Sequence, residues 1–540
     1  MRSKYNYFLL LFMVCIAIFF VNLDAIMVNI MEARNFVTAR EMINLDHWIF
    51  TTLNNEPRYE KPPLPTWLTA ISMLIFGMKN LFALRLPAAI MGTITVIFIY
   101  KLGLKFTANR KFAFIAGLIG ATSFYILYSG RDGQWDIHTH AWMLMAIYGL
   151  YKIFTDEANK FTNGVITGIL LGCSFLSKGP VSMYALLLPF LIAYGVVYKY
   201  RNLKDKWPAL LIMVLVALAV SASWSLYVYF FDTQAVAKIT EKETGRWLDY
   251  NTRPFYYYWS FVIQSGIWTI PAFVSLLYPY LKNRVFDKTG YKFTLWWTLA
   301  AVVLLSIIPE KKSRYLLPVL IPLALNTGFY IEYLFRRFDM MRKKEKWVVY
   351  FNFSLIALIG LAFPVIGFYL LKDQFTEIWP WYLLISICLV SIGTLIFYYL
   401  KKNRIKPVFY LTVWFIICII FFGFPLVKQL ELNPEYKSIS EVDRYLEEEP
   451  MPLYEYNGFT PEFIWEYGQP IESLKNGETY DIPENDKFLL LVSEEQLQEM
   501  KEVLAEFEIK KIDEINMNTQ PNTHRERLHR NLFLISRKSD

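Results

Sequence analysis

Cysteine and charge are both scarce in this sequence. Only four cysteines occur in 540 residues, and all four lie inside apolar stretches (Cys15, Cys173, Cys388 and Cys418). None has the short paired spacing of a metal site, so we assign them to packing and infer no redox compartment from them. Charged residues make up 19% of the chain and hydrophobic residues 55%. This balance is unusual for a soluble domain of this size and favours a membrane protein.

Concentrated basic segments and internal repeats are also missing. The net charge is +8, but the lysines and arginines are spread over short loops between apolar stretches. That distribution is typical of membrane orientation signals, so no nucleic-acid partner is expected. No internal repeat or low-complexity segment is evident.

Long apolar runs are abundant. Ala209–Tyr229, Val348–Leu371 and Phe409–Phe424 are each long enough to cross the roughly 30 Å hydrocarbon core as a helix. Met1–Val21 is followed by no small-residue cleavage site, so we expect a retained first helix rather than a signal peptide. The predicted fold class is a mainly α, polytopic helical membrane protein with a small C-terminal α/β domain outside the membrane.

Seven basic loops predict the number of crossings, because basic residues near span ends mark the cytoplasmic side. Two crossings between neighbouring basic loops, plus a last span near Pro407–Pro425, give about thirteen transmembrane helices. The N-terminus is then cytoplasmic and the long C-terminal tail lies on the outer side. The loops are Arg2/Lys4, Lys101–Lys111, Lys152–Lys160, Lys199–Lys206, Lys282–Lys292, Arg336–Lys346 and Lys401–Lys406.

The first outer loop, Asn22–Pro62, leaves room for only one crossing before the basic loop at Lys101. We therefore expect Pro63–Met78, which is short and begins after prolines, to lie in the interface or re-enter, while Leu81–Tyr100 crosses. Ala33–Asn44 has apolar residues at helical spacing with charges between them and predicts an interfacial helix.

The composition becomes charged after Pro425. The tail predicts strands at Pro452–Tyr456, Lys487–Val492 and Asn531–Ser536, with a helix at Ser493–Phe507. We therefore divide the chain into a transmembrane domain, residues 1–429, whose residues 22–80 form an outer loop with interfacial helices, and a soluble α/β domain, residues 430–540.

Basic residues in the short outer loops contradict the positive-inside trend. Lys178, in the turn Ser177–Pro180, and the cluster Lys311–Arg314 are the clearest cases. A lipid-borne phosphate would explain them, since lysine and arginine bind phosphate through charge-assisted hydrogen bonds. The alternative is that each side chain reaches the outer headgroups by snorkelling, which is less convincing for several loops together.

Acidic residues on the same side have a structural and a catalytic interpretation. Glu32 begins the interfacial helix and could complement its dipole. Asp136 begins the span Ile137–Thr155 and could be an N-cap. Both are also candidate catalytic carboxylates. His138 and His140, just inside that span, are better explained as interior residues than as metal ligands.

Several segments resemble a family of membrane glycosyltransferases. That family comprises the aminoarabinose transferases that modify lipid A and their relatives, the protein mannosyltransferases. The resemblance covers about the first 320 residues. It rests on Glu32-Ala33-Arg34, Ala39-Arg40-Glu41-Met42, Trp48, Arg58-Tyr59-Glu60-Lys61-Pro62-Pro63, Asp136, Ser177-Lys178-Gly179 and Lys311-Lys312-Ser313-Arg314-Tyr315.

The resemblance implies a GT-C fold, a polyprenyl-phosphate-linked sugar donor and specific carboxylates. The family has an Asp-Glu pair before the first-loop helix, with the Asp as favoured catalytic residue; here the pair is Met31-Glu32. Glu32 is the nearest replacement for the missing Asp, and Asp24 is a weaker one. Asp136 matches the second acidic position.

The resemblance also implies the residues around the donor phosphate and a metal. Arg34, Lys61, Lys178 and Tyr315 match the family's phosphate-surrounding positions, with Arg314 beside them. Glu60 matches a metal-contacting glutamate whose histidine partner is replaced here by Glu243. Two carboxylates can hold a hard divalent cation, and the substitution equally allows that no metal binds.

These expectations predict an inverting glycosyltransferase of the bacterial inner membrane, with many spans and a periplasmic C-terminal domain. The acceptor is lipid A, another glycolipid or a protein, as in the O-mannosyltransferases. The main rival is a non-enzymatic transporter of lipid or solute. Transporters place functional charges near the midplane, often in repeated broken helices, whereas the charges here gather at one interface.

Overall fold

The computed structural model describes residues 6–156, 158–201, 203–249, 251–430, 433–477, 479–520 and 525–538, without the side chains of 242–249 and 476. The chain forms two compact units. We call Met1–Ile26 with Tyr59–Lys428 the helical unit, and Met27–Arg58 with Gln429–Asp540 the sheet unit.

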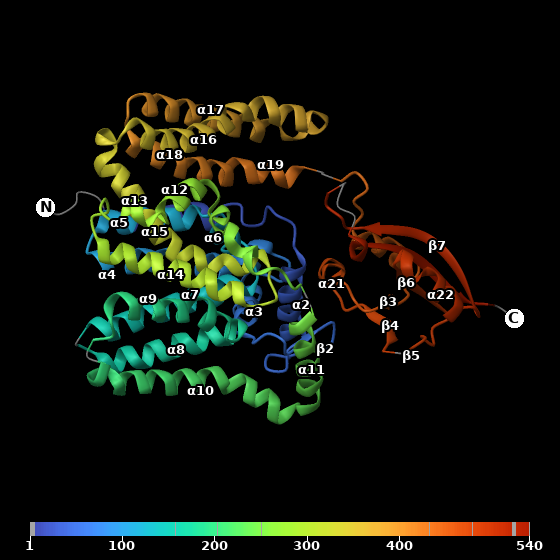
Figure 1. Ribbon diagram of the computed structural model, residues 1–540. Coiled ribbons are helices and arrows are strands. Elements are labelled where there is room, and N and C mark those ends of the chain that lie inside the picture. Colours follow the sequence, from blue (N-terminus) through green and yellow to red (C-terminus); the bar gives the residue numbers. More distant parts are fainter. Residues whose placement is uncertain are drawn as a thin grey trace. The chain divides into compact units, whose positions relative to one another are not determined.

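The helical unit consists of long helices that run side by side (Figure 1). Six helical stretches of the described residues are long and apolar enough to cross a membrane, and one of them, Lys343–Lys401, contains both α16 and α17. The long helices are α4 (Leu81–Thr107), α7 (Trp135–Thr155), α8 (Lys160–Lys178), α10 (Trp207–Phe231), α14 (Lys288–Ile307), α15 (Leu317–Arg337), α16 (Lys343–Leu371), α17 (Phe375–Lys401) and α18 (Ile405–Cys418).

Burial separates a central helix from peripheral ones. Helix α15 is buried along nearly its whole length and packs against α5 (Arg110–Thr122) and α14. Helices α16 and α17 are mostly exposed, with large apolar side chains such as Val365 and Tyr369 on the surface. An exposed apolar surface of this extent is typical of contact with lipid.

The short helices fit the expected arrangement of the first loop. Helix α1 (Tyr7–Phe19) precedes that loop, and α3 (Leu64–Phe76) follows it. At a rise of about 1.5 Å per residue, α1 and α3, with 13 residues each, extend about 20 Å, so helix length does not distinguish an interfacial α3 from a crossing α1. Helix α4 is long and apolar enough to be the expected crossing, and the interfacial position of α3 stays a prediction. The total of thirteen spans stays a prediction.

The sheet unit contains one mixed six-stranded sheet in the order β5-β4-β3-β6-β8-β7. Strands β4, β3 and β6 are parallel, while β5, β8 and β7 are antiparallel to their neighbours. The strands are β3 (Leu453–Asn457), β4 (Glu472–Asn476), β5 (Thr479–Tyr480), β6 (Lys487–Val492), β7 (Phe507–Asn516) and β8 (His529–Arg537).

Strand β6 is central and buried on both faces. Leu489 and Leu491 belong to one core cluster, while Phe488 and Leu490 belong to the other, as the alternation of a strand requires. One face packs α22 (Leu497–Val503) through Met500. A strand covered on both faces has a continuous apolar run, which explains why this strand was the clearest signal in the tail.

Helix α2 (Ile30–Asn44) belongs to the sheet unit, with the short hairpin of β1 (Thr52–Leu53) and β2 (Glu56–Pro57). From the sequence we assigned this loop to the transmembrane domain and expected an interfacial helix. In the structure its Val37 joins the core of the C-terminal domain, and Phe36 contacts Trp465 in an edge-to-face arrangement. The apolar face of α2 is therefore covered by protein.

The tail matches its predicted strands more closely than its predicted helix. Strand β6 has the expected bounds, and β3 and β8 overlap the other two predicted strands. The expected helix Ser493–Phe507 ends instead at Val503, because Phe507 begins β7. Strand β7 is an edge strand in which polar residues outnumber apolar ones and a bulge between Lys511 and Asp513 interrupts the alternation, so its sequence does not show the regular apolar alternation that predicts a strand.

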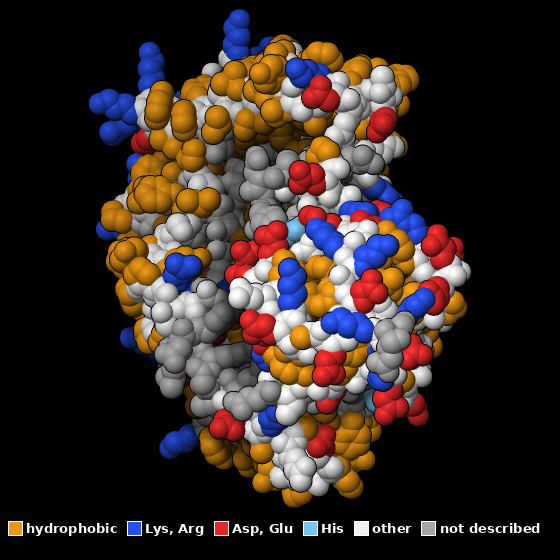
Figure 2. All heavy atoms as spheres, turned by 90° about the vertical axis from the view of Figure 1, so that its right-hand side faces the viewer, with side chains coloured by type: hydrophobic (Ala, Val, Ile, Leu, Met, Phe, Trp, Pro, Cys, Tyr) orange, Lys and Arg blue, Asp and Glu red, His pale blue; other side chains and the backbone are white. Residues whose placement is uncertain are grey.

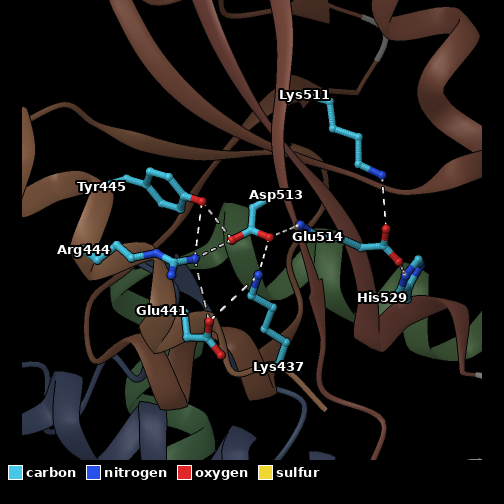
Figure 3. Close-up of polar contacts among 8 residues, drawn as sticks. All are labelled: Lys437, Glu441, Arg444, Tyr445, Lys511, Asp513, Glu514 and His529. Atoms are coloured by element: carbon cyan, nitrogen blue, oxygen red, sulfur yellow. Dashed lines mark hydrogen bonds and ion pairs between the residues drawn. The ribbon is translucent and has the colours of Figure 1, made fainter. Parts of the chain in front are cut away.

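A polar network attaches the chain segment after the last membrane helix to the edge of this sheet (Figure 3). Asp513, at a bulge in β7, accepts hydrogen bonds from Lys437, Arg444 (2.9 Å) and Tyr445 (3.0 Å). The neighbouring Glu514 interacts with Lys511 and His529 in the same view. The surface of the sheet unit carries both charge signs, interspersed (Figure 2), which is typical of a domain in water.

Candidate active site

A buried ion pair joins the ends of two neighbouring helices. Lys178 Nζ donates to Asp136 Oδ1, and both side chains are almost completely buried. The N-cap position of α7 is Gln134, so Asp136 lies inside the first turn and is not the cap. Each charge offsets the cost of burying the other, and removing either would leave an uncompensated charge.

The position of Lys178 follows from the end of α8. Lys178 is the last residue of the helix, and Gly179 caps it with φ 74° and ψ −154°. This backbone conformation favours glycine, since a side chain there would be strained. The carbonyl dipoles of a helix C-terminus also stabilise a cation.

Three cationic side chains lie around the ring of Tyr315. Its centroid lies 5.2 Å from Lys178 Nζ, 5.8 Å from Lys312 Nζ and 5.9 Å from Arg314 Cζ. The Tyr315 hydroxyl donates to Glu310 Oε1 (3.2 Å), which also pairs with Lys312 Nζ (2.5 Å). Positive charge therefore concentrates beside the Asp136–Lys178 pair, and Arg314 acts electrostatically on both members.

Lys311 has a structural role within this basic turn. Its ammonium donates to the carbonyl oxygens of Ile308 (2.5 Å) and Arg253 (3.0 Å). Burial lowers the pKa of Lys311. The residues of the cluster Lys311–Arg314 therefore have different roles. Lys311 joins two loops, whereas Lys312 and Arg314 lie near the ring of Tyr315.

Two tyrosines that were not among the candidates from the sequence hold this turn in place. The Tyr258 hydroxyl donates to the carbonyl of Lys312 (3.1 Å) and accepts from its N–H (3.0 Å). The Tyr257 hydroxyl is 3.0 Å from Ser313 Oγ. Both belong to η3 (Phe255–Trp268), and the aromatic run Phe255–Trp259 was the available signal.

The segment Tyr59–Lys61 is bound to the chain just after α10. Tyr59 donates to Asp232 Oδ2 (2.6 Å), between α10 and α11 (Thr233–Asp249), and its ring packs against Trp224. Burial and the bond to Asp232 raise the pKa of Tyr59. Glu60 and Lys61 are the next two residues, so this contact fixes the position of the backbone that carries both side chains.

Three polar atoms of these segments are buried without a hydrogen-bond partner among the described residues. They are Arg314 Nε, Glu60 Oε2 and His140 Nδ1. Leaving such an atom unsatisfied costs about 1–3 kcal/mol, so each of the three is a candidate contact for a ligand group or a water molecule. His138 is also buried, and its Nδ1 likewise has no partner within the described ranges.

Asp24 is engaged elsewhere. Its carboxylate accepts from Lys428 Nζ (2.5 Å), near the end of α19 (Phe424–Gln429), and this bond lowers the pKa of Asp24. Nearby, Asn22 Nδ2 donates to the carbonyl of Ile420 (2.9 Å). Asp24 therefore ties the end of the first helix to the last one, and the structure favours this role over the catalytic role expected for it.

Glu32 and Arg34 lie on α2 in the sheet unit. Glu32 completes a capping box with Asn29: its Oε2 accepts from Asn29 N (3.3 Å), while Asn29 Oδ1 accepts from Glu32 N (3.2 Å). The structural interpretation of Glu32 as a helix-end carboxylate is thus realised. The Arg34 carbonyl accepts from Arg58 Nη1 (3.3 Å).

Of the two expected metal ligands, only the side chain of Glu60 lies within the residues that the structure describes. Glu60 supplies a buried carboxylate oxygen, but the side chain of Glu243 lies outside the described residues. Among the residues that the structure describes, no group of three or more His, Cys, Asp or Glu side chains could hold a metal ion. The metal stays a prediction.

Residues 60–226 match the family model described as dolichyl-phosphate-mannose-protein mannosyltransferase. This range contains Glu60, Lys61, Asp136 and Lys178. It therefore includes the buried ion pair and the segment fixed by Tyr59.

Two curated relatives are similar over a longer stretch. Both are named undecaprenyl phosphate-alpha-4-amino-4-deoxy-L-arabinose arabinosyl transferase. The protein from Serratia proteamaculans is 24% identical over 61% of this chain and 60% of its own length. The protein from Shewanella sediminis is 26% identical over 66% of this chain and 65% of its own. The match thus spans less than two thirds of either relative.

A solved structure shares the whole fold. The crystal structure of ArnT from Cupriavidus metallidurans bound to undecaprenyl phosphate superposes with a TM-score of 0.72, at 16% sequence identity, over 98% of each chain. Its apo state gives the same TM-score and identity over 97% of each chain. The predicted class, a helical membrane protein with a small C-terminal sheet domain, is confirmed.

Proposed function

We propose that this chain is a membrane glycosyltransferase of the GT-C type that transfers a sugar from a polyprenyl-phosphate donor to a lipid A-type or other extracytoplasmic acceptor. The observation that carries this proposal is the buried Asp136–Lys178 pair with Tyr315 and Arg314 around it. Positive charge concentrated beside a carboxylate at the ends of membrane helices suits an anionic lipid headgroup.

The reaction is a direct displacement with inversion. The acceptor hydroxyl oxygen bonds to the anomeric carbon, and the bond from that carbon to the phosphate oxygen breaks with its electron pair leaving on the phosphate. Lys178 and Arg314, joined by Lys61, stabilise the charge that develops there. Because the leaving phosphate is already an ionised ester, no general acid is needed, unlike in glycoside hydrolysis.

The hydroxyl proton goes to a carboxylate. We assign this role to Glu32, which takes the place of the family's missing aspartate beside Met31. Asp136 keeps the Lys178 ammonium oriented when no phosphate is bound. Once the phosphate binds, the ammonium contacts both the phosphate and the Asp136 carboxylate. General-base assistance of this kind contributes on the order of 10²–10⁴-fold in rate.

The donor class is supported by the names of the relatives and by the undecaprenyl phosphate in the ArnT crystal structure. The acceptor has two candidates. The arabinosyl transferase relatives favour lipid A, whereas the mannosyltransferase match favours a protein hydroxyl. Supplying purified lipid A or a Ser/Thr-rich peptide to the same preparation decides between them by which one becomes glycosylated.

A divalent cation bound by Glu60 and Glu243 is part of the proposal. The unpartnered Glu60 Oε2 suits a metal ligand. When bound, the cation would supply further positive charge for the phosphate. Prolonged chelation before the assay tests this, and unchanged turnover would argue that no metal is needed.

The chain is a multi-pass protein of the bacterial inner membrane. We further propose a cytoplasmic N-terminus and a periplasmic C-terminal domain, supported by the seven basic loops. Labelling of single cysteines introduced at the exposed residues Glu449, in the C-terminal domain, and Lys401, in the last basic loop, in intact cells tests this. Labelling of the first, but not of the second, is expected.

The central experiment measures release of undecaprenyl phosphate from a lipid-linked sugar by the purified full-length protein. Glu32→Gln is expected to lower turnover about 10²-fold or more. Asp136→Asn is also expected to lower turnover, because Lys178 loses the carboxylate that orients it, while the matched variant Asp24→Asn stays near wild type. Wild-type turnover in both test variants would refute the carboxylate assignment. Transport of an intact solute without sugar turnover would favour the transporter alternative.

A further inference from the structure

The sheet unit combines two parts of the chain that are more than 370 residues apart. Helix α2 and its hairpin come from the first outer loop, and the rest comes from the tail after Lys428. The proposed function uses Glu32 and Arg34 on α2 but gives no role to the C-terminal domain. The contacts between these two parts indicate one.

Arg40 makes the first contact. Its guanidinium donates to the carbonyls of Ile464 (3.0 Å) and Trp465 (3.5 Å), in the last turn of α21 (Pro461–Tyr467). Arg40 is buried. A cation at a helix C-terminus is stabilised by the carbonyl dipoles there, and two contacts from one planar guanidinium group define the direction of the side chain as well as its distance.

Asn54 makes the second contact. Its Nδ2 donates to the carbonyl of Ile471 (2.7 Å), and its Oδ1 accepts from the N–H of the same residue (2.9 Å). The side-chain amide thus pairs with the domain backbone as a neighbouring strand would. Asn54 has φ 59°, a conformation that asparagine adopts more readily than most residues.

Glu41 connects these two contacts. Its carboxylate accepts from Thr52 Oγ1 (2.6 Å) and from the N–H of Asn54 (2.7 Å), so the hairpin is bound to α2 next to Arg40. Arg58 Nη1 adds a bond to Thr38 Oγ1 (2.9 Å) at the end of the loop. Helix, hairpin and domain therefore form one hydrogen-bonded piece.

Apolar packing supports the same arrangement. Val37 and Leu53 belong to the core cluster that contains Phe463, Ile464 and Ile471 of the domain. These side chains would be exposed to water if α2 left the domain. The sheet unit thus needs the first loop to complete its core, and the first loop needs the domain to fix its helix.

We propose that the C-terminal domain positions α2 for the transfer reaction, with Arg40 and Asn54 as the positioning residues; this rests on the proposed function. Eight residues separate Glu32 from Arg40, about 12 Å along a stiff helix, so fixing one end orients the other. The cations assigned to the phosphate, Lys178 and Arg314, lie in the helical unit. Loosening α2 therefore lowers turnover without weakening phosphate binding.

The test uses four variants of the full-length protein in nanodiscs. Asn54→Gly removes the amide but keeps a backbone that tolerates positive φ, and Arg40→Met removes the charged fork but keeps an apolar stem. Arg40→Lys restores a cation that can reach the carbonyls. Glu449→Ala breaks an exposed ion pair with Lys487 on the same domain and is the control.

The expected result separates kcat from binding. Asn54→Gly and Arg40→Met lower kcat about tenfold or more, Arg40→Lys recovers most of it, and Glu449→Ala does not change it. Binding of undecaprenyl phosphate, measured by native mass spectrometry, stays within about twofold of wild type in all four. Hydrogen exchange in the two impaired variants rises in residues 27–58 and in the segment 461–471 that they contact, and not in the helical unit.

Two results would overturn the inference alone. One is unchanged kcat in both Asn54→Gly and Arg40→Met while Glu32→Gln is impaired. The other is a loss of kcat accompanied by an equal loss of phosphate binding and by raised exchange throughout the protein, which indicates general destabilisation. If the wild type released no undecaprenyl phosphate, or if Glu32→Gln and Asp136→Asn kept full turnover, the proposed function would fail first.

Discussion

Lys178 and Asp136 form a buried ion pair between the last residue of α8 and the first turn of α7. Two opposite charges in a region of low dielectric are held together strongly, yet both remain costly to bury. The stability of the protein is therefore sensitive to any change in one partner of the pair.

Removing one member of this pair is expected to destabilise the protein more than removing both. Lys178→Met and Asp136→Leu should each cost about 3–5 kcal/mol, because one buried charge is left without its partner. The double variant should recover much of this stability but no transferase activity. Thermal unfolding in detergent, together with the release assay, measures both properties. Equal destabilisation in all three variants would contradict the ion-pair argument.

Two substitutions of Tyr315 distinguish the contribution of its ring from that of its hydroxyl. Tyr315→Leu removes the face over which Lys178 lies, and a lost cation–π contact of about 0.5–2 kcal/mol predicts undecaprenyl phosphate binding weaker by about 2–30-fold. Tyr315→Phe keeps the ring and loses only the bond to Glu310, so its binding should stay close to wild type. A binding defect of the same size in both variants would assign the effect to the hydroxyl.

Gly179→Ala is expected to strain the backbone directly after Lys178. The position has φ 74°, ψ −154° and open space where a Cβ would lie, so the penalty of about 1–3 kcal/mol comes from the backbone conformation and not from a clash. Gly77→Ala is the matched control, since Gly77 caps α3 with φ 100° and equally open space. Both should lower the melting temperature, but only Gly179→Ala should lower turnover. Turnover lost in both would mean that strain alone is harmful.

The sheet unit should lose stability in acid through Asp513. Burial alone would raise the pKa of this carboxyl, but hydrogen bonds from Lys437 and Tyr445 and from the backbone of Glu514 outweigh it and hold the pKa below its ordinary value of 3.8. A lowered folded-state pKa gives stability that is fully present above the ordinary value and is lost as the pH falls through the folded value.

Asp513→Asn tests this linkage. Scanning calorimetry of the full chain between pH 7 and pH 3 should show a smaller acid-dependent decrease for the sheet-unit transition in this variant than in wild type. Glu449→Gln, on an exposed residue of the same unit, serves as the control. An unchanged decrease in Asp513→Asn would show that other carboxyls cause the acid sensitivity.

Local sequence patterns determined the class of the protein and several of its elements. The apolar runs predicted membrane helices, and the continuous run Lys487–Val492 predicted the central strand with its observed bounds. The unexpected basic residues of the short loops drew attention to Lys178 and Arg314, which the structure places beside the ring of Tyr315; their role at the donor phosphate stays a prediction. These features depend on the hydropathy and periodicity of neighbouring residues, which a sequence shows directly.

Contacts between distant residues were decided only by the tertiary structure. Asp24 resembled a catalytic candidate until Lys428, about 400 residues later, appeared as its partner. The helix with Glu32 and Arg34 looked interfacial, but its apolar face packs on a domain that begins after Lys428. An amphipathic pattern shows that one face of a helix is buried but not whether lipid or protein buries it. That choice depends on the complementary surface, which exists only once the whole chain has folded.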